Sequence, residues 1–209
     1  MHKFLETKYR DERGITGLET AIILIAFVVV ASVFAFVVLS TGVFSAERAK
    51  ETVHAGLSEA RGSMAIRGSM IANADGTATT TVATLVFVVT NAVAGEPIDL
   101  TPPTDVGDDG IPDPGSSHKA VMGYDDENQQ IPDIVYTVTY LGDNDGDSLL
   151  EVGEKAQVTA KVGKAITATS GTALSKNSQF TLEFSPPKGA VMILQRVTPA
   201  QIDTVMNLN

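Results

Sequence analysis

The sequence has no cysteine and no tryptophan among its 209 residues. A chain without cysteine forms no disulfide framework, zinc–thiolate site or thiol nucleophile. Any part that lies outside a cell is therefore stabilised by other means. Basic residues are scarce too, and the formal charge is −10 at pH 7. This charge argues against a nucleic-acid partner, because such binding needs clustered Lys and Arg to neutralise phosphates.

Sequence signatures of catalysis are also missing. The chain contains no P-loop, no dinucleotide-binding fingerprint and no HExxH pair. None of its three histidines, His2, His54 and His118, has a nucleophile motif beside it. We therefore expect a protein that is not an enzyme and that binds no organic cofactor.

The acidic residues are concentrated in one block. Residues 96–154 contain 15 Asp and Glu but a single base, Lys119, whereas six bases and two acids follow from Lys155 onward. A block this acidic indicates bound cations, a salty medium outside the cell, or both.

What the sequence has in abundance is a long apolar run near its N-terminus. Between Ala21 and Leu39 the one polar side chain is Ser32. At about 1.5 Å per residue, a helix of this length crosses a hydrocarbon core of about 30 Å. Glu19 stands at the leading edge of the run. A charge so close to hydrocarbon needs a partner, so we interpret Glu19 as functional.

The residues before the run form a short charged leader. Residues 1–14 carry four bases and three acids and have no apolar core of their own. A secretory signal peptide is cut after its apolar segment, but here the processing point, Gly14–Ile15, comes before it. One interpretation is an ordinary single-pass membrane anchor with a basic cytoplasmic tail, oriented by the positive-inside rule.

A second interpretation comes from a family resemblance. Arg13-Gly14, followed by the residues ITGLE and an unbroken apolar helix, resembles class III, type IV pilin-like signal sequences. The longer stretch GITGLETAIILIAFVVVASVFAFVVLS resembles the N-terminus of archaellins, the archaeal flagellins. The resemblance implies that a prepilin-type signal peptidase, a membrane aspartic peptidase, cuts between Gly14 and Ile15. It also implies that Gly17 is the small residue three into the mature chain and that Glu19 is the fifth-position carboxylate.

Processing of this kind has a physical reason. An uncut charged leader would keep the helix end out of a dry packed interior, whereas cutting leaves a single α-amino group. Glu19 of the same or a neighbouring subunit can pair with that group. Such pairing lowers the cost of placing either charge in a low-dielectric environment.

The helix is expected to continue past the membrane stretch, as an assembly helix over residues 15–72. Small and apolar residues recur in its second half at spacings of three or four, which is one helical face. This stripe can pack against helices of other copies, since small residues allow close approach, or against the chain's own soluble domain. The stripe consists of Ala46, Ala49, Val53, Leu57, Ala60 and Met64.

Residues 73–209 are typical of a sandwich of short strands. The turn-forming residues 73–76 are expected to end the helix, and no later segment has a helical period. The predicted fold is therefore α+β, a long N-terminal hydrophobic α-helix followed by an antiparallel immunoglobulin-like β-sandwich. Strand-like segments rich in Val and Thr lie at 77–90, 134–140, 155–162, 179–184 and 190–197.

The family resemblance extends to the C-terminal end. The text FTLEFSPPKGAVMILQRVTP, residues 180–199, resembles the last hairpin of archaellins. Residues 186–189, Pro-Pro-Lys-Gly, are the turn of this predicted hairpin.

A loop rich in Pro, Gly and Asp is predicted at residues 101–115 (TPPTDVGDDGIPDPG). We interpret it as a variable surface loop. Its acids Asp105, Asp108, Asp109 and Asp113 are expected to be solvated, and cation binding is the alternative.

Residues 143–154 have the spacing of a calcium loop. A twelve-residue calcium loop supplies side-chain oxygens from positions 1, 3, 5, 9 and 12 and a backbone carbonyl from position 7. Ser148 departs from the pattern at position 6, which normally holds Gly, and strands flank the loop, so it is not an EF-hand. We interpret it as a candidate structural Ca²⁺ loop, with a solvated acidic turn as the alternative. The ligands would be Asp143, Asp145, Asp147, Glu151, Glu154 and the carbonyl of Leu149.

The resemblance to archaellins implies a structural subunit of the archaellum, the helical surface filament of archaea that drives swimming, and the other observations agree with this role. The expected parts are a removed leader (1–14), an assembly helix (15–72) and an outward-facing sandwich (73–209). The expected partners are other copies of the chain, the signal peptidase, the membrane before assembly and the archaellum assembly machinery. Two alternatives remain: a subunit of a type IV pilus-like adhesion filament, and a membrane-anchored immunoglobulin-like binding domain.

Overall fold

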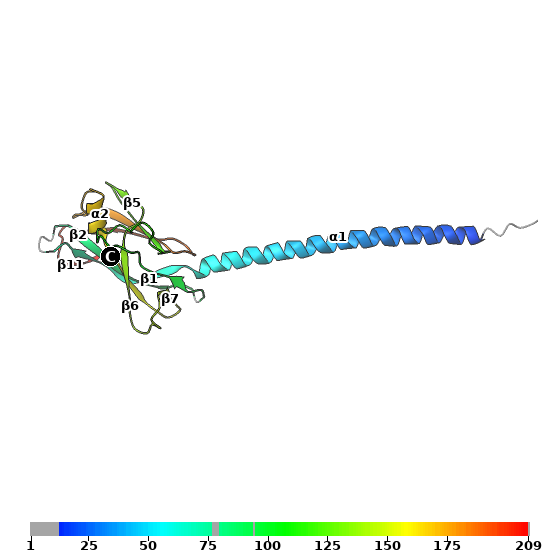
Figure 1. Ribbon diagram of the computed structural model, residues 1–209, viewed down its shortest axis with the longest axis horizontal. Helices are drawn as coiled ribbons and strands as arrows, with labels where there is room; N and C mark the ends of the chain where they lie inside the picture. Colours follow the sequence, from blue (N-terminus) through cyan, green and yellow to red (C-terminus); the bar gives the residue numbers. More distant parts are fainter. Residues whose placement is uncertain (1–12, 77–79, 94, 209) are drawn as a thin grey trace, which may run out of the picture. The chain divides into compact units, whose positions relative to one another are not determined.

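The computed structural model describes residues 13–76, 80–93 and 95–208 (Figure 1). The chain divides into two compact units, Met1–Val53 and His54–Asn209, which are described separately below. The predicted leader 1–14 lies outside the described residues except for its last two positions.

One long helix, α1, spans Arg13–Arg61. It contains no proline, and its only polar side chain between Ala21 and Leu39 is Ser32. The predicted end of the assembly helix at residue 72 is therefore wrong. The chain leaves the helix after Arg61 and forms strand β1, Met64–Ala74.

The physical reason for the early end of α1 lies in two glycines and a partner strand. Gly62 follows the last helical turn, and Gly68 has φ +83°, which no helix accommodates. β1 pairs with β2 on one side and with a C-terminal strand on the other, and its Met70 and Ala72 are completely buried. Burial of these side chains outweighs the helical spacing of the stripe, whose last member, Met64, belongs to the sandwich core.

Two antiparallel sheets make up the sandwich. The five-stranded sheet has the order β11-β1-β2-β8-β6, and the four-stranded sheet has the order β10-β9-β4-β5. The strands of the first sheet are β1, β2 (Val82–Asn91), β6 (Tyr136–Tyr140), β8 (Ala156–Ala160) and β11 (Val205–Leu208). Those of the second are β4 (Val121–Asp126), β5 (Gln130–Ile131), β9 (Gln179–Ser185) and β10 (Met192–Val197). A small separate pair is formed by β3 (Ile98–Asp99) and β7 (Leu149–Leu150).

The two sheets share one hydrophobic core, with aromatic rings at its centre. Along β9, Phe180, Leu182 and Phe184 are buried while the residues between them face outward. Phe184 meets two rings of the opposite sheet edge-on, Phe87 with centroids 6.4 Å apart and Tyr136 at 5.2 Å. Edge-on contacts of this kind add stability beyond the area they bury. The predicted α+β class, a long helix followed by antiparallel sheets, is confirmed.

Each of the five predicted strand segments corresponds to a strand of the structure. The segments at 77–90, 134–140, 155–162, 179–184 and 190–197 correspond to β2, β6, β8, β9 and β10, although residues 77–79 lie outside the described part. The predicted C-terminal hairpin is confirmed, since β9 and β10 pair antiparallel across residues 186–191.

The expectation of no helix after residue 73 is wrong. A short helix, α2, spans Val162–Ala168 directly after β8. It buries Val162, Ala165 and Ile166, which lie three or four residues apart on one face. With seven residues, α2 is too short for a helical period to be distinguished in the sequence from the strand-like segment that precedes it.

Candidate functional site

The most unusual surface of the chain is the apolar surface of α1. Every large apolar side chain from Leu18 to Leu57 is exposed, with exposed fractions between 44% and 72%. From Ala21 to Leu39 these side chains surround the helix on all sides, so no face of it is suited to water. Apolar surface of this extent marks a membrane or protein contact. By length and composition the helix could also cross a membrane.

Two hydroxyls in the apolar part of this surface are satisfied within the helix. The Ser32 hydroxyl donates to the carbonyl of Val29 at 2.8 Å. The Thr41 hydroxyl donates to the carbonyl of Val37 at 2.9 Å. Hydroxyls bonded in this way leave no donor unpaired when the helix enters lipid or a packed helix core.

The predicted processing residues lie in the first turns of α1. Gly14 and Ile15 are its second and third residues. A Cβ added at Gly17 would meet nothing within 4 Å, so packing within the chain does not require a small residue there. Glu19 is exposed, and no hydrogen bond or ion pair joins it to another described residue. Any partner of this carboxylate therefore comes from outside the described chain.

The second half of α1 is polar as well as apolar. Arg48 and Glu51 form an exposed ion pair at 3.2 Å, and the Arg48 guanidinium lies 5.4 Å from the centre of the Phe44 ring. Exposed pairs of this kind contribute little to stability. The stripe members Ala46, Ala49, Val53 and Leu57 are exposed.

The end of α1 is fastened to the sandwich by a close backbone contact, which we call the junction. A Cβ on Gly62 would lie 2.5 Å from the carbonyl oxygen of Lys188, within the turn between β9 and β10. Gly189, at φ +106°, in turn packs against the backbone of Gly62. The backbone N–H of Ala92 donates to the carbonyl of Ser63 at 2.9 Å. Two glycines are thus required where two backbones touch.

An ion pair borders the junction. Glu96 accepts a hydrogen bond from the Ser58 hydroxyl at 2.7 Å and pairs with the Lys188 ammonium through its other oxygen. The Lys188 ammonium, followed by the Ser58 hydroxyl, lowers the pKa of the Glu96 carboxyl. Sequence reasoning missed the junction, because Ser58, Glu96 and Lys188 are far apart in the chain and have no motif in common.

The predicted calcium loop carries its acids at the surface. Asp145 accepts a hydrogen bond from the backbone N–H of Asp147 at 3.2 Å, and Asp147 accepts one from Leu149 at 2.8 Å. Glu154 accepts one from the backbone N–H of Glu151 at 2.9 Å. The exposed carboxylates are Asp143, Asp145, Asp147 and Glu151.

These carboxylates are not gathered around one point. Within the residues that the structure describes, no three Asp, Glu or His side chains are grouped so that they could hold a metal ion. The carbonyl of Leu149 belongs to β7, which pairs with β3. The calcium site therefore stays a prediction, and it requires the carboxylates to turn away from the loop backbone.

The loop at residues 101–115 is anchored more firmly than its composition predicts. The side chain of Asp105 is only 4% exposed, and it pairs with the Lys161 ammonium at 3.0 Å. Burial acts to raise the pKa of Asp105, but the Lys161 ammonium and the N–H groups of Asp109 and Gly110 outweigh burial and lower it. The expectation that Asp105 is solvated is therefore wrong.

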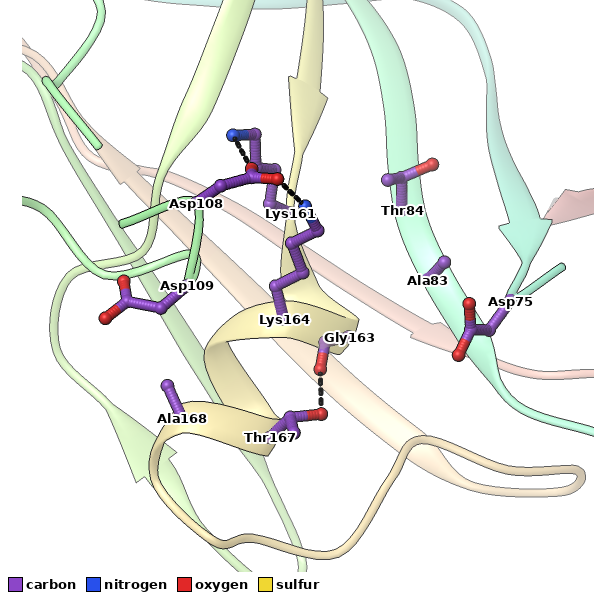
Figure 2. A pocket seen from close by; sticks show the side chains of 10 residues that line it. All are labelled: Asp75, Ala83, Thr84, Asp108, Asp109, Lys161, Gly163, Lys164, Thr167 and Ala168. Atoms are coloured by element: carbon purple, nitrogen blue, oxygen red, sulfur yellow. Dashed lines mark hydrogen bonds and ion pairs between the residues drawn. The ribbon is translucent and has the colours of Figure 1, made fainter. Parts of the chain in front are cut away.

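A cavity of about 580 Å³ lies beside this anchor, between the loop, α2 and the start of β2. Figure 2 shows Asp108 between the ammonium groups of Lys161 and Lys164, with Asp75 and Thr84 across the cavity. The Lys161 ammonium lies 2.8 Å from Asp108. Asp105 and Asp108 of the loop pair with both lysines, so among the described lining residues no cation is left free for an anionic ligand.

Known proteins resemble this chain over most of its length. Residues 14–196 match the family described as archaeal-type flagellin. "Probable flagellin 1" of Archaeoglobus fulgidus is 34% identical over 203 residues, which is 95% of this chain and 96% of that protein. "Probable flagellin 1" of Aeropyrum pernix is 30% identical over 208 residues, with 93% and 96% covered.

A solved structure of the archaeal flagellum of Methanospirillum hungatei has a similar subunit. Its TM-score is 0.60 at 25% sequence identity, and the match covers 92% of this chain and 98% of that one. The similarity therefore includes both the long helix and the sandwich.

Proposed function

Because the chain belongs to the archaeal-type flagellin family, we propose that α1 is the element through which it polymerises. The chain is a structural subunit of an archaeal flagellar filament at the cell surface, outside the cell. One observation carries the proposal for α1: the apolar side chains from Leu18 to Leu57 have no cover in the single chain. Packing α1 against the helices of other copies covers them without a change in the sandwich.

Before assembly, α1 would reside in the cytoplasmic membrane. Its internally satisfied hydroxyls suit both lipid and a helix core. Exchange of lipid contacts for protein contacts conserves apolar burial, so close packing drives assembly. Extraction of each subunit from the membrane needs an energy source, which we assign to the archaellum assembly machinery. This role is structural and needs no catalysis by the chain itself.

Removal of the leader would release the helix end for packing. We propose that a prepilin-type signal peptidase cuts between Gly14 and Ile15, and that Glu19 pairs with the α-amino group of Ile15 in its own or a neighbouring subunit. The absence of a described partner for Glu19 within the chain supports this pairing. A paired carboxylate is far cheaper to bury than an isolated one.

The test is a Gly14→Val variant, which should resist cutting. Mass spectrometry and N-terminal sequencing of the membrane fraction should find the leader intact, and electron microscopy should find no filaments. Gly42→Ala is the matched control, since a Cβ at Gly42 meets nothing within 4 Å and the variant should be cut normally. Full-length filaments of Gly14→Val at normal yield would contradict the proposal. Assays of swimming and of surface attachment on the same strains distinguish the two roles. Loss of swimming indicates a flagellar filament, and loss of attachment indicates an adhesive one.

A second proposal concerns the loop at residues 143–154. We propose that it binds Ca²⁺ weakly, at roughly 10⁻⁴ to 10⁻³ M, as extracellular modules do. The order of its oxygen donors and the crowding of its exposed carboxylates support this, since a cation would relieve their repulsion. In a calcium titration, the NMR shifts of Gly146 and its neighbours should move together with a rise in melting temperature. An Asp145→Asn/Asp147→Asn variant should lose both responses. If calcium changes neither the NMR shifts nor the melting temperature of the wild type, the proposed site is refuted.

A further inference from the structure

The outer face of the four-stranded sheet carries an apolar strip along its edge strand, β10. We define the β10 strip as Val191, just before β10, Ile193 and Val197 of β10, and Val121 of β4, with exposed fractions of 48%, 62%, 56% and 38%. In the register of the sheet, Ile193 lies opposite Glu183 and Val197 opposite Gln179, on the face away from the core. Leu194, which lies between them in sequence, is buried. Because successive side chains of a strand point to opposite faces of the sheet, the strip lies on the face away from the core.

This edge lacks the usual protection against other chains. Natural edge strands carry Lys, Pro or a bulge that prevents a second chain from pairing with them. The sequence of β10, MILQRV, has one charge, Arg196, and its pairing with β9 is regular. The Arg196 side chain donates to the carbonyl of Leu208 at 3.3 Å, across to β11. The guanidinium is thus engaged with this chain's own backbone and does not guard the outer face.

Another edge of the sandwich is built differently. The edge strand β6 has the sequence YTVTY and presents Thr137 and Thr139 on the exposed side of its sheet. Hydroxyls there suit water, whereas Ile193 and Val197 do not. This contrast with β6 indicates that another molecule covers the exposed apolar side chains of β10.

The strip is continuous with the end of α1. The turn that leads into β10 contacts the junction, because Gly189 packs on Gly62 and the backbone N–H of Ala190 donates to the Ser63 hydroxyl at 3.3 Å. Val191, the first member of the strip, follows directly. The turn before β10 therefore connects the β10 strip directly to the end of α1, the helix that we propose packs against other copies.

From these observations we propose that the β10 strip packs against a second copy of this chain in the filament. The inference rests on the proposed polymerisation through α1 and adds the sandwich as a second contact between copies. The partner is another subunit that offers apolar surface to Ile193 and Val197.

The absence of cysteine makes a direct test available. An Ile193→Cys variant is labelled with a maleimide in intact purified filaments and again after dissociation into subunits in detergent. We expect labelling of Ile193→Cys to be at least tenfold slower in filaments. The matched control is Thr139→Cys, on the exposed side of the edge strand β6, which should change less than about threefold. Val197→Cys replaces Ile193→Cys if the latter yields no filaments.

Each outcome decides the question. Equal labelling of Ile193→Cys in filaments and subunits would overturn the proposal, and so would equal slowing of the control, which would reflect general crowding. Slowing in filaments on cells that vanishes in purified filaments would assign the strip to a different protein and also overturn it. Because the comparison is made within existing filaments, its failure leaves the role of α1 untouched, and that role is tested separately by the Gly14→Val variant.

Discussion

The junction predicts opposite effects of alanine at two glycines of the chain, Gly62 in the junction and Gly56 six residues before it. Gly62→Ala adds a Cβ at 2.5 Å from the Lys188 oxygen, 2.8 Å from the Lys188 carbonyl carbon and 3.2 Å from the Gly189 nitrogen. All three atoms belong to the backbone, so they cannot swing aside as the end of a flexible side chain would. Overpacking of this kind costs about 1–3 kcal/mol. At about 2–4 °C per kcal/mol for a domain of this size, the melting temperature should fall by roughly 2–12 °C.

Gly56→Ala is the matched control, because it makes the same chemical change on the same helix. A Cβ at Gly56 meets nothing within 4 Å. Alanine in a helix interior is favoured over glycine by roughly 0.5–1 kcal/mol, so this variant should melt at the wild-type temperature or up to about 4 °C above it.

Thermal unfolding of detergent-dissociated subunits, followed by near-ultraviolet circular dichroism of the tyrosines, measures both variants. Dissociated subunits are required because Gly56 lies on the proposed assembly surface, where a new methyl group also affects packing between copies. If Gly62→Ala melts at or above the temperature of Gly56→Ala, the backbone contact at the junction is not the constraint described here.

Three further substitutions test the sandwich. Phe184→Ala removes the ring at the centre of the core and should lower the free energy of unfolding by about 3–5 kcal/mol in urea titrations; a loss below 1 kcal/mol would contradict the described packing. The pKa of Asp99 is lowered to about 2 by the Lys119 ammonium, so its stabilisation is present above the usual pKa of 3.8 and is lost as the pH falls toward 2. Asp99→Asn should therefore lose less stability than wild type between pH 4 and 2, and parallel profiles would refute the assignment. Lys161→Met leaves the buried Asp105 carboxylate unpaired and should cost roughly 3 kcal/mol, which the same urea titrations measure; an unchanged midpoint would exclude the anchor.

The features that the sequence predicts correctly are those encoded locally. The apolar run from Ala21 to Leu39 has one polar residue, and only a helix satisfies its backbone in lipid or a packed core. The hairpin of β9 and β10 is likewise encoded by alternating residues on either side of the turn at residues 186–189.

The features that sequence reasoning missed depend on partners far along the chain. The stripe continues its helical spacing to Met64, but pairing with β2 converts that segment into a strand. Asp105 has the composition of a solvated loop acid, yet its partner, Lys161, lies 56 residues away. Gly62 and Gly189 are ordinary glycines in the sequence, and only the fold brings their backbones together.

The anchored loop at residues 101–115 has a practical consequence. Asp105 holds the base of the loop through Lys161, while the neighbouring Val106 is 91% exposed. Loop tips of this kind tolerate insertion. A short peptide spliced in between Val106 and Gly107 would be displayed once per subunit, so the filament would become a regular, multivalent scaffold for enzymes, epitopes or mineral-binding tags.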